Sequence, residues 1–223
     1  MPRMKERDDT GMKIETAVER LHEEIEELLA KEAAFYRGRE LKRSPSPGKT
    51  PLLAAIDGRC GAGKTTLAAR LQERTGWSVL HMDHFFLRPE QRTEERFRMP
   101  GGNIDFERFL EEVLLPLKRG EADVSYRPYD CHRQKMAAPV LLKPGEVCLI
   151  EGSYSCHPAL WDMYDLHIFL SVDAREQMRR IIGRNGADGA KAFRERWIPL
   201  EEAYFAEYRV EERCEVRLEI ATP

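Results

Sequence analysis

One short stretch of the chain, residues 56–67, has the residue types and spacing to hold phosphate groups. It reads IDGRCGAGKTTL, in which Gly58, Gly63, Lys64 and Thr65 fit the pattern Gly-x-x-x-x-Gly-Lys-[Ser/Thr]. The backbone N–H groups of such a loop point at an anion, and side chains at the glycine positions would obstruct them. Lys64 is expected to reach the outer phosphates, and Thr65 to offer its hydroxyl to a magnesium ion. The stretch therefore predicts a bound nucleoside triphosphate.

The local context supports this prediction. Residues 52–56, LLAAI, are short and apolar enough for a buried parallel strand. Residues 66–74 carry Leu67 and Leu71 four apart, which is helical spacing. The helix N-terminus adds partial positive charge at the loop. The predicted nucleotide contacts are those of Gly58, Gly61, Ala62, Gly63, Lys64, Thr65 and Thr66.

Two carboxylates are expected beside this loop. Asp83 ends a predicted strand over residues 77–82, and Glu151 ends another over residues 147–150. Parallel strands present their carboxyl ends at one edge of a sheet, which is where ligands bind. A carboxylate at the position of Glu151 can orient magnesium or its water ligands.

The remaining periodicity predicts a doubly wound, mostly parallel sheet of about five strands with helices on both faces. Further strands are expected over residues 166–170 and 216–220, the latter at an edge. Further helices are expected over residues 105–117, 173–184 and 193–208. Residues 88–102 are predicted to form a mobile loop over the site, and residues 126–133 a loop or short edge strands.

The predicted helix 173–184 is rich in arginine, with Arg175, Arg179, Arg180 and Arg184. Basic helical faces are usually just solvated. This one follows the strand after Glu151, where many phosphate-transferring folds place a closing lid whose arginines meet the transferred group. We therefore predict an arginine-bearing lid, with residues 185–189 as its hinge.

Composition limits the other possibilities. The 223 residues suffice for one sizeable α/β domain with an appendage. A net charge of -3 gives no case for nucleic acid or membrane binding. The five cysteines form no Cys-x-x-Cys pair and are expected to be reduced thiols. No apolar run approaches the ~18 residues of a membrane span and the first residues lack a secretory core, so a cytoplasmic protein is expected.

The first part of the chain is predicted to be a helical appendage, residues 1–43. Five apolar residues alternate spacings of four and three: Ile14, Val18, Leu21, Ile25 and Leu28. The stripe could be a dimer seam and hence support a homo-oligomer, but packing on the chain's own body is favoured, since it spans too few heptads. A linker, residues 44–50, contains SPSPG and separates the appendage from the main domain, residues 51–223.

Taken together, the motifs resemble the uridine kinase family of P-loop kinases over about residues 51–220. The matching segments, besides IDGxxGxGKTT, are Asp83-x-Phe-Phe, Asn103-Ile104-Asp105, Tyr129-Asp130, Ile150-Glu151-Gly152, Tyr164-Asp165-Leu166-x-Ile168-Phe169 and Arg179-Arg180. The segment Asp83 to Glu90 and Trp197-x-Pro199 are also similar to nicotinamide riboside kinases.

The resemblance implies a P-loop nucleoside triphosphate hydrolase fold and roles for particular residues. It implies that Asp83 accepts the proton of the attacking hydroxyl and that Asp105 holds ribose hydroxyls. Phe86, Tyr129, His132 and Arg133 would contact the acceptor, and Arg179, Arg180 and Arg184 would belong to the lid. The spacing from Asp130 to His132 is shorter than in uridine kinases.

We therefore expect transfer of the γ-phosphoryl group of ATP, with Mg²⁺, to a hydroxyl of a small molecule, most simply a nucleoside 5'-hydroxyl such as that of uridine or cytidine. The alternatives are a kinase of nicotinamide riboside or another small metabolite, and an ATP-binding regulatory protein without such activity. A GTPase is disfavoured because no Asn-Lys-x-Asp signature occurs.

Overall fold

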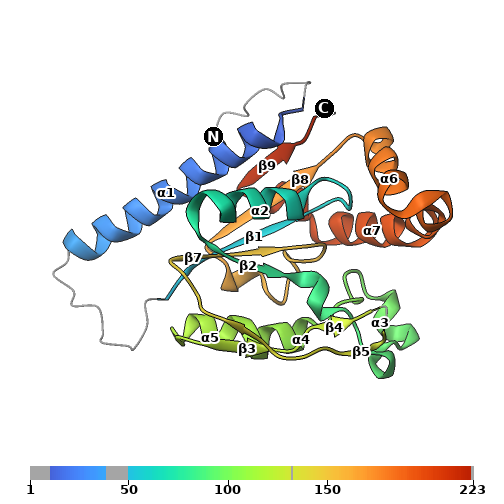
Figure 1. Ribbon diagram of the computed structural model, residues 1–223, viewed down its shortest axis with the longest axis horizontal. Helices are drawn as coiled ribbons and strands as arrows, with labels where there is room; N and C mark the ends of the chain where they lie inside the picture. Colours follow the sequence, from blue (N-terminus) through green and yellow to red (C-terminus); the bar gives the residue numbers. More distant parts are fainter. Residues whose placement is uncertain (1–10, 39–49, 132, 222–223) are drawn as a thin grey trace.

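The centre of the molecule is a sheet of five parallel strands, seen in a computed structural model that describes residues 11–38, 50–131 and 133–221 (Figure 1). The strands are β1 (Leu52–Gly58), β2 (Ser78–His81), β7 (Val147–Glu151), β8 (Leu166–Ser171) and β9 (Val216–Glu219). Their order across the sheet is β2-β7-β1-β8-β9, and every neighbouring pair is parallel. The prediction of about five strands, with the last at an edge, is confirmed.

Two helical layers cover the sheet because side chains alternate along each strand. Leu52, Ala54 and Ile56 of β1 belong to a core shared with α1 (Ile14–Gly38) and α2 (Lys64–Thr75). Leu53 and Ala55 belong to the other core. That second core contains side chains of α4 (Phe106–Phe109), η3 (Leu110–Leu114), α5 (Leu115–Lys118), α7 (Ile198–Tyr208) and α8 (Val210–Arg213).

The segment predicted as a loop over the site is partly helical. It contains η2 (Pro89–Gln91) and α3 (Glu94–Arg98). Arg96 ties α3 to the following chain by donating to the carbonyls of Gly102 at 2.9 Å and Ile104 at 2.8 Å. These bonds give the segment a definite structure that its Pro and Gly content did not indicate.

Small two-stranded sheets lie beside the main one. They pair β3 (Val124–Tyr126) with β6 (Val140–Leu142), and β4 (Tyr129–Asp130) with β5 (Lys135–Met136). The short strands predicted near residues 126–133 are therefore present, but they are not edges of the main sheet. Short 3-10 helices complete this region: η1 (Met82–Phe85) and η4 (Trp161–Met163).

The lid region is one long element, α6 (Ala174–Ala192), followed by the π-helical turn η5 (Phe193–Trp197) and α7. The predicted hinge is a kink within α6 and not a loop. Its backbone is non-helical at Gly186, where φ is +72° and ψ is 172°. A left-handed φ of this kind is readily adopted only by glycine.

The first helix packs on the body of the chain, as the sequence favoured. Ala17, Val18, Leu21 and Ile25 are buried in the core shared with α2 and the sheet. The proposed linker lies largely outside the described residues, so the division into appendage and domain stays a prediction. Within the described ranges, no helix is both long and apolar enough to cross a bilayer.

The packing of α1 predicts a large contribution to stability. Leu21 is fully buried, so Leu21→Ala should lower the free energy of unfolding by about 2–5 kcal/mol. Leu141→Ala is the matched control, because Leu141 is 58% exposed and the same deletion there should cost under about 1 kcal/mol. Denaturant unfolding measures both, and equal losses would contradict the packing of α1.

Candidate active site

A cavity of about 1290 Å³ opens at the carboxyl edge of the sheet. The chain reaches this edge five times, after β1, β2, β7, β8 and β9, and the strand order reverses around β1, which favours ligand binding there. The walls include the loop from Cys60 to Thr66, Asp83, Phe86, Arg92, Asn103, Glu151, Tyr154, Arg180, Arg184, Arg196, Trp197 and Glu201. The predicted nucleotide loop and both predicted carboxylates therefore share one cavity.

The loop has the backbone of an anion-binding turn. Gly61 and Gly63 have φ of +78° and +104°, the left-handed region that favours glycine. Gly63 immediately precedes α2, whose first N–H groups lack helical partners and face the loop. Ala62 and Thr66 also line the cavity. The residues from Gly61 to Thr66 that were predicted to contact the nucleotide therefore line one cavity.

Gly58 has a different reason to be glycine. A Cβ atom there would lie 1.9 Å from the carbonyl oxygen of Leu170 on β8, and Gly58 is not part of the cavity wall. Its N–H is already donated to the carboxylate of Asp57 at 2.7 Å. Gly58 therefore has a packing role, because it allows β1 to approach β8, and its predicted contact with a phosphate stays a prediction.

Lys64 lies folded over the loop. Its ammonium donates to the carbonyl oxygens of Gly58 at 2.5 Å and Arg59 at 3.2 Å, and lies 3.5 Å from Ser153 Oγ. Its side chain is buried, yet the residue lines the cavity. A cation held by neutral carbonyls retains its full charge for an incoming phosphate.

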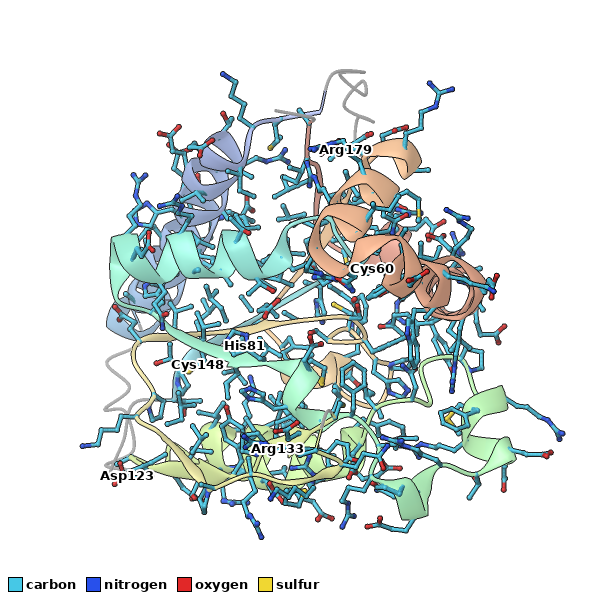
Figure 2. All side chains as sticks on the ribbon, turned by 45° about the vertical axis from the view of Figure 1, so that its right-hand side comes forward. Cys60, His81, Asp123, Arg133, Cys148 and Arg179 are labelled. Carbon is cyan, nitrogen blue, oxygen red and sulfur yellow. The ribbon has the colours of Figure 1, made fainter. Side chains whose placement is uncertain are left out.

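The two residues predicted to bind the metal, Thr65 and Glu151, are in direct contact. The Thr65 hydroxyl donates to both carboxylate oxygens of Glu151, at 3.1 and 3.3 Å. The second partner of Glu151 is His81, whose Nδ1 lies 2.5 Å from Oε1 (labelled in Figure 2). That hydrogen bond is the main reason why the pKa of His81 is raised, against the effect of its partial burial.

Asp83 is accessible to water within the cavity, on η1 directly after β2. The surrounding protein raises its pKa by desolvation, and the negative charge of Glu151 raises it further. Lys64, His81 and Arg184 act in the opposite direction. Asp83 is thus a carboxylate made more basic by its surroundings and placed where cations of the site reach it.

The three predicted lid arginines are in different places. Arg180 donates to the carbonyls of Gly61 at 3.1 Å and Ala62 at 3.3 Å, so it is fixed to the nucleotide loop. Arg184 lines the cavity. Arg179 points outward and pairs with Glu176, with its side chain 64% exposed, and Figure 2 shows it far from His81. This arrangement does not bring Arg179 to the site.

The predicted acceptor contacts are brought together only in part. Phe86 lines the cavity. Asp105 is buried and does not line the cavity. It caps α4 by accepting from the Arg108 N–H at 3.2 Å and from the Arg108 Nε at 3.3 Å. Tyr129 does not line the cavity itself, but its hydroxyl lies 3.3 Å from Nη2 of Arg92, which does. Arg133 is exposed and pairs with Asp130.

One predicted acceptor contact cannot be placed, and several cavity residues were not predicted from the sequence. His132 lies outside the described residues. The additional cavity residues include Arg92, Phe97, Asn103, Cys131, Tyr154, Arg196 and Glu201. The Pro and Gly residues around Arg92 and Phe97 suggested only a loop, and nothing in the α7 pattern distinguished Glu201 from a solvated glutamate.

Known proteins with similar sequences include uridine kinases. No family model matches the chain. A uridine kinase of Saccharomyces cerevisiae is 30% identical over 156 residues, which are 62% of this chain and 30% of that protein. A uridine kinase of Halobacterium salinarum is 29% identical over 139 residues, 58% of this chain and 60% of that protein. The match thus spans less than two thirds of either relative.

Solved structures agree in fold. A possible uridine kinase from Bacillus stearothermophilus has a TM-score of 0.57 at 20% identity, covering 86% of this chain and 99% of that one. The fold is that of the P-loop kinases. A candidate fructose transport system kinase from Silicibacter sp. TM1040 gives 0.59 at 23% identity, covering 96% and 100% of the two chains. A D-glycerate 3-kinase from Cryptococcus neoformans gives 0.58 at 15%, covering 92% of both.

The comparisons confirm the resemblance to the uridine kinase family and the predicted fold class. They do not distinguish among acceptors, because the P-loop kinases of this fold include proteins named for a nucleoside, a sugar and a glycerate.

The packing at Gly58 gives a testable prediction. Gly58→Ala should lower the free energy of unfolding by about 3 kcal/mol or more, because the new Cβ would overlap Leu170. Gly183→Ala is the control: its Cβ would meet nothing within 4 Å, and the change should stabilise α6 by about 0.5–1 kcal/mol. Thermal and denaturant unfolding measure both variants. A Gly58→Ala protein of normal stability that had lost ATP binding would show instead that Gly58 leaves space for a phosphate.

Proposed function

We propose that this protein is an ATP-dependent phosphotransferase that moves the γ-phosphoryl group to a hydroxyl of a small molecule, a nucleoside 5'-hydroxyl in the first instance. The observation that carries the proposal is the single cavity shared by the nucleotide loop, the Thr65–Glu151 pair and Asp83. The names of the curated relatives support the same assignment.

The residues present fit a magnesium ion. Thr65 and Glu151 offer a hydroxyl and a carboxylate, the hard oxygen ligands that Mg²⁺ prefers. No group of three or more His, Cys, Asp or Glu in the described ranges could hold a metal ion unaided. This agrees with an ion that takes most of its ligands from phosphates and water. When bound, Mg²⁺ neutralises charge on the β- and γ-phosphates.

Asp83 is the group proposed to handle the proton. It would accept the proton of the acceptor hydroxyl as the new O–P bond forms and the bond from the γ-phosphorus to the leaving oxygen breaks. The raised pKa of Asp83 makes it a better proton acceptor than an ordinary aspartate. Lys64 and Arg184 would stabilise the charge on the transferred group, so catalysis comes mainly from positioning and neutralisation.

This mechanism predicts that Asp83→Asn lowers kcat by about 10²–10⁴-fold while the affinity for ATP stays within about twofold. The amide keeps the shape of the side chain but cannot take the proton. Acceptor-stimulated ADP release and equilibrium ATP binding measure the two quantities. Asp123→Asn is the control, because Asp123 is exposed and does not line the cavity. Figure 2 shows Asp123 far from Cys60, which does line it.

The screen for the acceptor uses the same assay with nucleosides, pantothenate and sugars. An ATP-binding regulatory protein is the rival from another class, and it predicts no rise in ADP release with any acceptor. Turnover of Asp83→Asn at the wild-type rate would remove Asp83 from the mechanism but leave the kinase assignment in place.

A second acceptor class is favoured by the charges on the acceptor wall, which we define as the part of the cavity lining that contains Phe86, Arg92 and Arg196. Arg92 and Arg196 line the cavity, and neither forms an ion pair with a described residue. Arg92 donates to the Leu87 carbonyl at 3.1 Å and to Tyr129, which fixes its guanidinium. Arg92 and Asp83 line the same cavity, together with Cys131. A hydroxyl acceptor with a carboxylate or phosphate would fit this wall, and a cationic one such as nicotinamide riboside would fit less well.

The two acceptor classes differ in what Arg92→Gln should do. For an anionic acceptor, the variant should raise KM for the acceptor at least tenfold without changing KM for ATP, because a charge-assisted hydrogen bond is lost. For a neutral nucleoside the change should be under about threefold. Arg70→Gln serves as the control, since Arg70 is an exposed residue of α2 paired with Glu73. Steady-state kinetics with the best acceptor from the screen decides between them.

A further inference from the structure

The segment that begins α1 lies in the wall of the nucleotide cavity. Lys13, Ile14 and Glu15 line it together with Ile220 and Ala221 from the other end of the described chain. This is unexpected for a helix that sequence patterning treats as an appendage. We propose that the start of α1 forms one wall of the subsite for the purine base of ATP; the inference rests on the proposed function, in which the loop holds the triphosphate.

The order of strands gives the direction in which the base must lie. The nucleotide loop follows β1, at the centre of the sheet. Asp83 follows β2, at one edge, and Ile220 follows β9, at the opposite edge. An acceptor beside Asp83 must meet the γ-phosphate, so the rest of ATP extends the other way. Two strand spacings, about 10 Å, separate β1 from β9, which suits the reach from phosphates to base.

The backbone fixes the segment beside β9. Met12 donates its N–H to the Glu219 carbonyl at 2.7 Å and accepts from the Ala221 N–H at 2.9 Å, forming a parallel bridge with Ile220. Gly11 packs so closely that an added Cβ would lie 2.8 Å from the Ala221 nitrogen. The start of α1 is therefore held in place as an extension of the sheet.

The side chains of this region suit a flat aromatic ring. Ile14, Ile181 and Ile220 supply apolar surface, and the Ile14 side chain comes within 3.8 Å of a Cβ built on Gly63 of the loop. Arg180 connects the nucleotide loop to the segment after β9, because it donates to the Ala62 carbonyl at 3.3 Å and to the Ala221 carbonyl at 3.0 Å. Apolar side chains with a planar guanidinium are a suitable surface for a purine.

The test compares two ligands that differ in the base. A non-hydrolysable ATP analogue and inorganic tripolyphosphate, each with Mg²⁺, are titrated into the full chain and into Ile14→Ala by calorimetry. We expect Ile14→Ala to weaken binding of the ATP analogue by about tenfold and to leave tripolyphosphate unchanged. Leu28→Ala is the control, on the same helix and against the same core but outside the cavity, and it should alter neither affinity.

A second measurement needs no variant. Hydrogen exchange of the amides in residues 12–18 should be slowed by the ATP analogue and not by tripolyphosphate. Equal affinities in wild type and Ile14→Ala, or an equal loss for both ligands, would overturn the inference while leaving the kinase assignment intact. A wild-type chain that binds neither ligand would instead overturn the proposed function, and with it the subsite.

Discussion

The arrangement of the site depends on one buried carboxylate, that of Asp57. It has no exposed surface, and desolvation raises its pKa. Four donors surround it: the N–H groups of Gly58, Tyr154 and Cys156 at 2.7, 3.1 and 2.9 Å, and the Tyr204 hydroxyl at 2.9 Å. A buried carboxylate without such partners would cost several kcal/mol. Satisfying it joins the end of β1, the turn after β7 and helix α7 in one structure.

Neighbouring contacts extend this junction into the nucleotide loop. Glu201 of α7 accepts from the Cys60 N–H at 3.0 Å and from the Ser153 hydroxyl at 2.5 Å. Arg59 pairs with Glu202 at 2.8 Å. The loop is thus held from one side by the sheet and from the other by α7. Its shape is set by protein contacts, which is what a preorganised phosphate site requires.

Sequence reasoning identified the parts of the site that local patterns encode. The glycines at 61 and 63, Lys64 and Thr65 are recognisable because an anion-binding turn needs those residue types at that spacing. Buried parallel strands are recognisable because they are short apolar runs. Asp83 and Glu151 followed from these, since each comes directly after such a run.

The remaining features depend on contacts between distant residues. Tyr204 and Asp57 are 147 positions apart, and no local pattern links them. Arg179 and Arg180 are adjacent in the sequence but point about 100° apart on a helix, so only the docking of α6 decides which meets the loop. Asp105 had a local signal that was available, because an aspartate just before a helix is a common N-cap. The family resemblance instead suggested a ribose contact.

The kink at Gly186 has a mechanical consequence for the region around the cavity mouth. Residues 187–197 form a short rod with irregular backbone at both ends, the non-helical glycine at one and the π-helical turn η5 at the other. Arg180 and Arg184 precede the first joint, and Glu201 follows the second. Rotation at these two irregular points would move the segment between them, together with the neighbouring wall residues Arg196 and Trp197, relative to Arg180 and Arg184. Such a rotation would change the proposed acceptor side of the cavity and leave the proposed nucleotide side in place.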